Sequence, residues 1–173
     1  RDRLFIGLEG FYKQFLDIPL SVATGVPLTC LGADYGSIGE ELLVSDASGR
    51  SYGVELLVRW LIPDKITLVG SATLYKSEFK SGKDAGYVPS AWDNRFITNL
   101  SAVYELPRYW SIGAKVSAIG GAPYTPFDEE ASSLKQYWDA AGRPVYDYGK
   151  YNQERLDPYC QLDLRVDKNF YFK

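Results

Sequence analysis

The sequence predicts an all-β fold, an antiparallel up-and-down transmembrane β-barrel segment, on two observations. Apolar and polar residues alternate with a period of two in six stretches, residues 3–15, 50–62, 65–77, 92–106, 110–119 and 159–173. Such alternation is typical of β-strands whose two faces meet different environments. The connections between the stretches are long, short, medium, short and long in turn. An up-and-down membrane barrel shows this alternation because its short turns lie at one end and its long loops at the other.

The stretch 50–62 shows the pattern most clearly. Its first face is wholly apolar with an aromatic residue near each end, and consists of Tyr52, Val54, Leu56, Val58, Trp60 and Ile62. The second face carries Glu55 and Arg59. A soluble sheet covers its apolar face with other protein, whereas a barrel strand turns that face to lipid and the other to a wet lumen. We expect the barrel arrangement.

The other five stretches repeat this pattern. In chain order their apolar faces consist of Leu4, Ile6, Leu8 and Tyr12, then Ile66, Leu68, Ala72 and Leu74, then Phe96, Leu100, Ala102 and Tyr104, then Trp110, Ile112, Ala114 and Val116, then Leu162, Leu164, Val166 and Phe170. Residues 63–65 and 107–109 each begin with proline and have the chemistry of tight turns. The stretches are longer than a usual soluble strand of about 5–6 residues, which favours a large barrel.

One segment of the last long connection has a helical period. Leu134, Tyr137, Trp138 and Ala141 recur at i, i+3, i+4 and i+7, and Asp128 precedes them as a plausible N-cap. Gly142 follows the last periodic residue. The pattern predicts a short amphipathic helix over residues 129–141, with its Tyr-Trp face packed on the rim of the barrel.

Composition excludes several classes of function. The net charge of −3 gives no reason to expect a nucleic-acid partner, and the absence of histidine excludes a His-based catalytic triad or a His-containing metal site. The acidic run at 128–130 lacks EF-hand spacing, so a solvated helix start is favoured over a Ca²⁺ site. We expect no catalytic residue, no metal and no cofactor. The chain has no apolar run of about 18 residues that would predict a transmembrane helix.

The two ends of the sequence and its two cysteines lead to further expectations. The chain opens on Arg1 beside a strand and stops at Lys173 within one, so we expect it to be an excerpt of a longer polypeptide. Cys30 and Cys160 are expected on the extracellular side. A disulfide between them suits that compartment, but the connection 17–49 has to cross several strands to reach Cys160. The pairing stays open.

Three stretches resemble the TonB-dependent transporter (receptor) barrels of Bacteroidetes outer membranes. They are GRSYGVELLVRW at 49–60, the segment 92–130, and ERLDPYCQLDLRVDKNFYF at 154–172. The most specific parts are GGAPYTP at 120–126 and RLDPYCQLDLRVDK at 155–168. Where the family often has a histidine before its last strand, this chain has Cys160, which removes any role of a histidine there.

The resemblance implies a barrel of about 22 strands in the outer membrane of a Gram-negative cell. Residues 1–173 would form part of one barrel domain, near its C-terminal end. The N-terminal plug domain, the remaining strands, the segment that contacts TonB and any site for a surface lipoprotein would lie outside this chain. Such receptors use TonB to drive the uptake of scarce nutrients such as an iron chelate, cobalamin or a glycan. The implied partners are the lipid bilayer, the plug, TonB and a small-molecule or glycan ligand.

Polar residues of the second face are candidates for contact with the plug or the lumen. They are Glu55, Arg59, Asp93, Arg95, Asn99, Lys115, Asp163, Arg165 and Asp167. A solvated barrel wall with cross-strand charge pairs is the favoured interpretation, ahead of direct contact with a substrate. The residues 163–167 form the densest set, with alternating sign, and are a candidate for a lock-like contact with the plug.

Aromatic residues fall into two groups. Those on apolar faces near strand ends fit interfacial girdles, namely Tyr12, Tyr52, Trp60, Tyr104, Trp110 and Phe170. Those in the expected extracellular loops are candidates for ligand contact, because flat rings suit sugars and aromatic chelates; they are Tyr35, Tyr87, Trp92, Tyr124, Tyr137, Trp138, Tyr146, Tyr148 and Tyr151. The same residues also fit a role as ordinary loop anchors.

Two alternative classes remain open on the sequence alone. One is a smaller outer-membrane barrel with a structural or enzymatic role. The other is a soluble β-sandwich that acts as a binding module. An upstream plug sequence separates the transporter from the smaller barrel, and extraction only by detergent excludes the soluble module.

Overall fold

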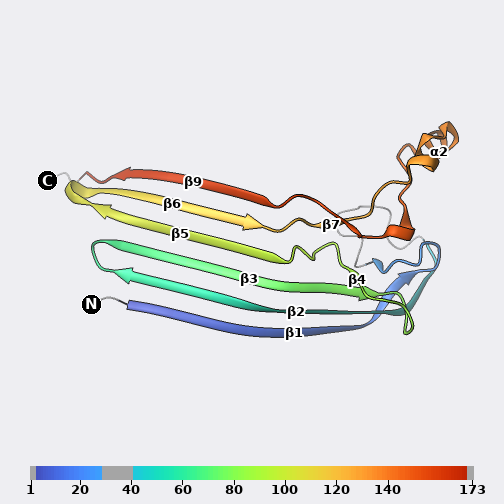
Figure 1. Ribbon diagram of the computed structural model, residues 1–173, viewed down its shortest axis with the longest axis horizontal. Helices are drawn as coiled ribbons and strands as arrows, with labels where there is room; N and C mark the ends of the chain where they lie inside the picture. The colour runs from blue at the N-terminus through green and yellow to red at the C-terminus, as the bar shows by residue number, and fades with distance from the viewer. Residues whose placement is uncertain (1–2, 29–40, 171–173) are drawn as a thin grey trace.

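The computed structural model describes residues 3–28 and 41–170 and shows an antiparallel β-sheet (Figure 1). In order across the sheet, its long strands are β1 (Arg3–Ser21), β2 (Leu43–Ile62), β3 (Ile66–Lys80), β5 (Phe96–Leu106), β6 (Trp110–Ile119) and β9 (Tyr159–Lys168). Each long strand pairs with the next one along the chain. The predicted all-β antiparallel arrangement of six strands is therefore confirmed. Cys30 and Tyr35 lie outside the described residues, so the Cys30–Cys160 pairing and a ligand role for Tyr35 stay predictions.

The register confirms the predicted faces of the strands. Directly opposed residues in antiparallel strands lie on the same face of a sheet. One row of successive partners runs Leu8, Leu56, Ala72, Thr98, Ala118 and Cys160. The neighbouring row, on the opposite face, runs Glu9, Glu55, Thr73, Ile97, Ile119 and Tyr159. The apolar faces of all six strands thus join into one surface, which we call the apolar face, and the other side is the polar face.

Two strands extend further than their alternation indicates. β1 continues to Ser21 across an irregularity in its pairing between Phe15 and Ile18, where Asp17 has φ +54°. The irregularity breaks the period of two, so the sequence pattern stops early. β2 starts at Leu43, seven positions before the predicted start at 50. The predicted irregular connection over 17–48 is therefore wrong at both of its ends.

The connections are arranged as predicted. Lys65 N–H donates to the Ile62 carbonyl at 3.1 Å in the turn between β2 and β3. A short 3₁₀ segment η2 (Pro107–Tyr109) joins β5 to β6. Figure 1 shows both of these turns at the end of the sheet where β1 begins and β9 ends, and the longer connections at the other end. We call these the turn end and the loop end.

Small elements lie at the loop end. β4 (Val88–Pro89) adds to β3, and β7 (Pro123–Tyr124) pairs with β8 (Glu154–Arg155) in a separate small sheet. A 3₁₀ segment η3 (Tyr148–Lys150) lies before β8.

The predicted helix over 129–141 is two helices, α1 (Glu129–Ser133) and α2 (Lys135–Ala141). Asp128 is the N-cap, because its carboxylate accepts from Ala131 N–H at 2.9 Å, and Gly142 ends α2 with φ +64°. Leu134 breaks the helix, with φ −82° and ψ 122°. Tyr137 is 45% exposed and Trp138 47% exposed, and Figure 1 shows the helices projecting away from the sheet. The expectation that their Tyr-Trp face packs on a rim is wrong.

The buried cluster of the described residues is small and lies at the loop end. It consists of Ile18, Leu20, Val26, Ala47, Phe79 and Tyr151, with Val88 packed against it. Much of the apolar face is exposed instead, with Leu8 77% and Leu164 73% exposed. Within residues 3–28 and 41–170, no helix is long and apolar enough to cross a membrane.

Candidate functional site

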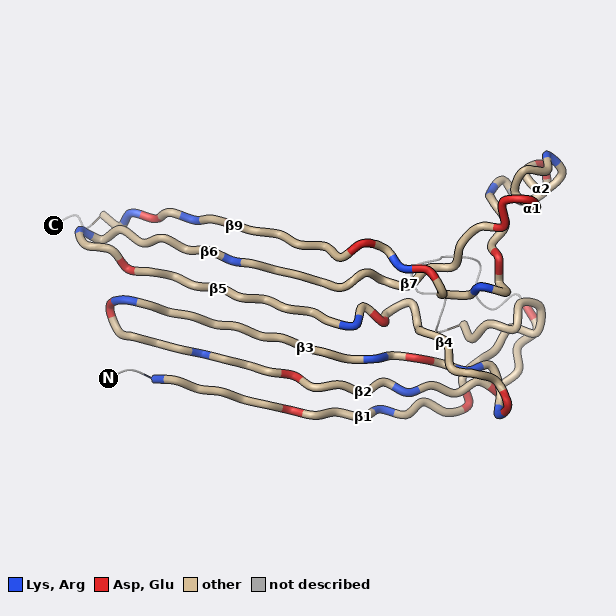
Figure 2. Tube along the Cα trace, in the orientation of Figure 1, with Lys and Arg blue, Asp and Glu red and all other residues tan. Residues whose placement is uncertain are grey.

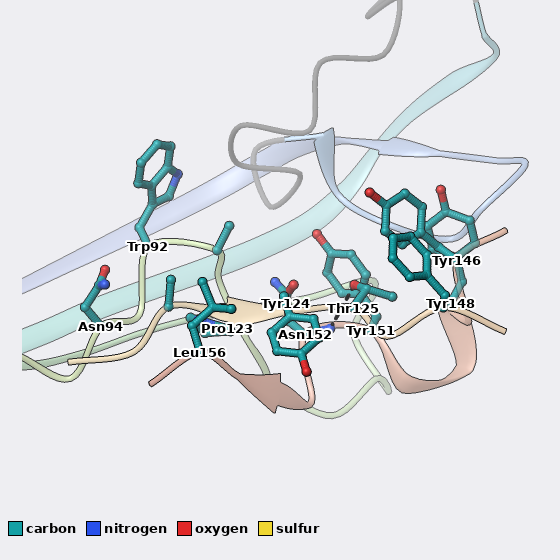
Figure 3. Close-up of a pocket in the computed structure, with 13 residues that line it drawn as sticks. Trp92, Asn94, Pro123, Tyr124, Thr125, Tyr146, Tyr148, Tyr151, Asn152 and Leu156 are labelled. Carbon is teal, nitrogen blue, oxygen red and sulfur yellow. Dashed lines mark hydrogen bonds between the residues drawn. The ribbon is translucent and has the colours of Figure 1, made fainter. Parts of the chain in front are cut away.

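A cavity of about 570 Å³ at the loop end is the candidate ligand site (Figure 3). Its walls come from the turn before β5, the segment that follows β6 and the segment that precedes β9. The lining residues are Ala91, Trp92, Asn94, Ala122, Pro123, Tyr124, Thr125, Phe127, Tyr146, Tyr148, Tyr151, Asn152 and Leu156. Six of them are aromatic and none is charged. We call this cavity the aromatic pocket.

The two most specific stretches of the resemblance meet in the wall of this pocket. Pro123 pairs with Arg155 and Tyr124 with Glu154 in the β7–β8 register. Leu156 N–H donates to the Ala122 carbonyl at 3.0 Å and continues this pairing. The stretch 120–126 and the start of the stretch 154–172 are thus one structural unit, although about thirty residues separate them in the sequence.

Two glycines permit the close approach of these segments. A Cβ atom at Gly121 would lie 1.6 Å from the Leu156 carbonyl oxygen, and one at Gly120 would lie 1.9 Å from the Asn94 carbonyl oxygen. Neither backbone oxygen can move away without displacing its strand or turn. Both positions therefore require glycine because of the neighbouring backbone.

A buried ion pair fastens this unit to the main sheet. Arg155 donates to the Asp93 carboxylate and to the Asp93 carbonyl, and it also donates to the Gly121 carbonyl at 3.0 Å. Asp93 accepts in addition from Ser77 N–H of β3 at 2.8 Å. The Asp93 side chain is 2% exposed and that of Arg155 20% exposed. The pair thus connects β3, the turn before β5 and β8.

Asp93 and Arg95 were expected on the polar face of a strand over 92–106, and this expectation is wrong for both. β5 begins at Phe96, and Arg95 precedes it with φ +68°, which interrupts the extended backbone. Asp93 is buried in the turn before β5, whereas Arg95 is exposed. The alternation of polar and apolar residues continued by chance through this turn, so a period of two extended the strand too far.

Amide and hydroxyl groups hold the pocket walls in place. Asn94 donates through Nδ2 to the Gly120 carbonyl at 2.8 Å, and Asn152 donates through Nδ2 to the Pro89 carbonyl at 2.9 Å. Asn152 N–H donates to the Thr125 hydroxyl at 3.1 Å. The Tyr75 hydroxyl of β3 donates to the Trp92 carbonyl at 2.8 Å. The walls are thereby attached to the rigid sheet.

The aromatic side chains give the pocket its chemistry. The rings of Phe127 and Tyr146 lie 4.9 Å apart, and those of Tyr146 and Tyr148 lie 6.1 Å apart. Figure 3 shows Trp92 at the opposite end of the pocket from these tyrosines. Aromatic walls with a few amide and hydroxyl groups suit a ligand that has flat apolar surfaces and hydrogen-bonding edges.

The structure brings together only part of the predicted loop aromatics. Trp92, Tyr124, Tyr146, Tyr148 and Tyr151 line the pocket. Tyr87 lies instead over the Arg50 guanidinium, with its ring centre 4.1 Å away. Tyr137 and Trp138 belong to α2 and do not line the pocket.

Four lining residues with polar or aromatic side chains were not predicted as candidates: Asn94, Thr125, Phe127 and Asn152. Thr125 lies within the stretch GGAPYTP and Phe127 directly follows it, so closeness to that motif was the usable signal for both. Nothing in the local pattern marks the two asparagines.

The remaining polar-face candidates lie on strands and share the face that the register assigns. Lys115 is directly opposite Asp163, and the Ser117 hydroxyl donates to Asn99 Oδ1 at 2.9 Å. Arg165 Nε lies 2.7 Å from Asp167 Oδ2 within the same strand. Glu55 and Arg59 are exposed on β2. Both interpretations of these residues, a charged wall and a lock-like contact of residues 163–167 with a plug, stay predictions.

The predicted girdle residues lie near both ends of the apolar face. Tyr12 and Tyr52 are cross-strand partners toward the loop end, with ring centres 6.4 Å apart. Trp60, Tyr104 and Trp110 lie toward the turn end. Phe170 follows the end of β9 and is 71% exposed.

In the part of the chain that the structure describes, no group of three Asp, Glu, Cys or His side chains is placed to hold a metal ion. Comparison with protein-family models, with curated proteins and with solved structures finds no match to this chain.

Proposed function

We propose that this chain forms part of the barrel wall of a TonB-dependent outer-membrane transporter that takes up a scarce nutrient. The observation that carries the proposal is the apolar face, which spans six strands and remains largely exposed. Leu8, Ile6 and Leu164 are 77%, 62% and 73% exposed on this face. Water-soluble proteins rarely expose apolar patches larger than a few hundred Å², so such a face needs an apolar surrounding.

The length of the apolar face along its strands matches a bilayer. Along β2 the apolar residues of this face run from Val54 to Ile62, and their partners in β3 run from Leu74 to Ile66; we call this part of the face the apolar band. Each series spans about nine residues, compared with about 9–11 residues for a tilted transmembrane β-strand. Tyr12 and Tyr52 lie just beyond one end of the band, at the level where aromatic belts occur.

The polar face and the sheet edges fit a larger barrel. The polar face carries cross-strand neighbours of opposite charge such as Lys115 and Asp163, which suits a wet lumen and a plug. Among the described residues, β1 and β9 are the two edges of the sheet. A membrane-spanning sheet cannot leave edges unpaired in lipid, so in the proposed protein both edges pair with strands of a barrel of about 22 strands.

The aromatic pocket supports a role in capturing a ligand. It lies at the loop end, which faces outward in the proposed orientation, and it contains no charged lining residue. An uncharged aromatic lining favours a ligand part that is itself flat and uncharged, such as a sugar ring, over a strongly charged chelate. The ligand classes under this proposal remain an iron chelate, cobalamin or a glycan, with the pocket favouring the last.

Fractionation of cells that produce the full-length protein tests the proposal. We expect extraction only by detergent, a species much heavier than the 19.4 kDa of this chain, and a change of gel mobility on boiling. A 19.4 kDa species that is released by salt and shows no heat shift would contradict the proposal. Cross-linking in cells distinguishes the transporter from a smaller barrel, because only the transporter should form a cross-linked product with TonB.

A further inference from the structure

A second cavity, a shallow groove of about 790 Å³, lies on β1, β2 and β3 toward the loop end. Its lining includes Gly10, Tyr12, Arg50, Tyr52, Val54, Leu74 and Lys76. The register places these seven residues on the apolar face, in three adjacent rows. In the row nearest the loop end Arg50 pairs with Glu78, in the next row Tyr52 pairs with Lys76, and in the third row Val54 pairs with Leu74. The groove therefore crosses the border between the apolar band and the loop end.

The floor of the groove is apolar and open. Gly10 lies opposite Val54, and a Cβ atom at Gly10 would have nothing within 4 Å. The missing side chain leaves a channel beside Val54 and Leu74, which are 47% and 59% exposed. The floor continues directly into the apolar face, so an extended apolar chain can lie in it.

The edge of the groove nearest the loop end carries a net positive charge. Arg50 Nε and Lys76 Nζ each lie 2.6 Å from Glu78, whose side chain is only 3% exposed. Burial by itself raises the pKa of the Glu78 carboxyl, but the hydrogen bonds from Lys76 and Arg50 outweigh burial and hold this pKa below its usual value. Two cations against one carboxylate leave one positive charge at this edge. Figure 2 shows basic and acidic positions of β2 and β3 close together toward the loop end.

Both cations are fixed and still reachable. The Arg50 guanidinium lies 4.1 Å from the ring centre of Tyr87 and 5.6 Å from that of Tyr52. The side chains of Arg50 and Lys76 are 36% and 52% exposed. An arginine has five N–H donors and a lysine three, and Glu78 occupies only some of them. The edge can thus donate hydrogen bonds to an anion without any rearrangement.

We propose that this groove binds a phosphate-bearing lipid of the bilayer leaflet at the loop end. The lipid phosphate lies against Arg50 and Lys76, and an acyl chain lies in the channel beside Gly10, Val54 and Leu74. The inference rests on the proposed membrane function, because that function places the border of the apolar band at the level of the lipid headgroups. Basic pockets at this level are suited to anionic headgroups, and the long side chains of lysine and arginine reach such headgroups readily.

The charge and shape of the groove favour this occupant. A zwitterionic lipid adds a cation that the net positive edge repels, and an acidic or neutral peptide would not use an open channel that continues into the apolar face. Inorganic phosphate shares the headgroup chemistry but cannot use the channel. A lipid that has both an anionic phosphate headgroup and an acyl chain can therefore bind to both ends of the groove.

The experiment uses the full-length protein in an uncharged detergent, titrated with phosphatidylglycerol or phosphatidylcholine and followed by native mass spectrometry. We expect preferential binding of phosphatidylglycerol. Lys76→Gln should weaken that binding about fivefold, the effect of one basic residue at a membrane surface. Lys13→Gln is the matched control, because Lys13 lies on β1, which also lines the groove, but on the opposite face of the sheet, and it should leave binding unchanged.

A second variant tests the channel without changing any charge. Gly10→Val fills the space beside Val54, and the absence of neighbours within 4 Å predicts normal folding. It should reduce the binding of long-chain phosphatidylglycerol more than that of a short-chain analogue. If the wild type binds both lipids equally and neither variant changes this, the lipid site is wrong. If the protein is extracted only by detergent and shows a heat shift, that result overturns the lipid site and leaves the proposed function standing. Release of the protein by salt, without a heat shift, overturns the proposed function itself.

Discussion

Asp93 and Arg155, 62 positions apart in the sequence, form a buried ion pair that joins β3 to the wall of the aromatic pocket. Neither residue lines the pocket, yet both support segments that do. Trp92 and Asn94 flank Asp93, and Leu156 follows Arg155. The shape of the pocket therefore depends on a contact outside it.

Loss of this ion pair should loosen the pocket. Asp93→Ala leaves Arg155 without its carboxylate, and breaking a buried pair costs about 3–5 kcal/mol. We expect faster hydrogen exchange and faster proteolysis over residues 120–156, with little change in the central strands. Asp163→Ala removes an exposed carboxylate on the polar face and serves as the control. Equal protection of residues 120–156 in both variants would show that the ion pair does not hold this segment.

A double-mutant cycle measures the pair itself. Removing both side chains in Asp93→Ala/Arg155→Ala avoids an uncompensated buried charge. The double variant should lose less protection over 120–156 than the sum of the two single variants. Additive losses would mean that the two residues act independently.

Gly121→Ala should disrupt the β7–β8 unit. Its Cβ would lie 1.6 Å from the Leu156 carbonyl oxygen, so the backbone has to shift, at a cost of about 1–3 kcal/mol. We expect a lower temperature of local unfolding for the loop end and weaker ligand binding. Gly86→Ala is the control, since a Cβ there meets nothing within 4 Å. A Gly121→Ala variant as stable as the control would contradict the close approach of the two segments.

Aromatic residues of the pocket should contribute to ligand binding, whereas the exposed ones on α2 should not. An aromatic stacking contact contributes about 0.5–1.5 kcal/mol, so Trp92→Ala should weaken binding by about 2–12-fold. Trp138→Ala removes the same type of side chain outside the pocket. The measurement is equilibrium binding of neutral oligosaccharides and of a charged ferric chelate to the full-length protein. Equal losses in both variants would exclude a specific role of the pocket, and preferential binding of the charged chelate would contradict the expected ligand chemistry.

Adjacent residues of β2 should report opposite environments. In a variant with Cys30 and Cys160 replaced by serine, spin labels are placed at Leu56→Cys and, separately, at Glu55→Cys. Relaxation by lipid-soluble oxygen should be strong at position 56 and weak at position 55, and relaxation by a water-soluble nickel complex should show the reverse. Similar exposure of both labels to water would mean that the apolar face does not contact lipid.

Much of the sheet could be predicted from the sequence because side chains in a strand alternate between two faces. This local geometry needs no knowledge of distant residues. The faces of Glu55 and Leu56 followed from it and agree with the register. Both turns were predicted separately, from their proline-containing sequences. The rule of alternation failed where the backbone leaves the extended conformation, at Asp17 and Arg95, both of which have positive φ. Strand ends were therefore misplaced while strand faces were correct.

The helix shows a similar limit. The spacing of Leu134, Tyr137 and Trp138 predicted one helix. The predicted ends are correct, because Asp128 is the N-cap of α1 and Gly142 is the C-cap of α2. The extended backbone of Leu134 divides that helix, and the segment projects away from the sheet. A helical period indicates which residues share a face, but it does not determine what that face packs against.

The sequence by itself determined the class of the sheet, the two faces of each strand and the residues of the apolar face, because these depend on a period of two within single strands. Only the tertiary structure decided the aromatic pocket, the Asp93–Arg155 pair and the groove between Arg50, Lys76 and Gly10. Each of these brings together residues from different strands or loops, and their contact depends on the register and on the path of the long connections. Alternation constrains each strand separately, whereas a site requires several strands and loops to meet in one place.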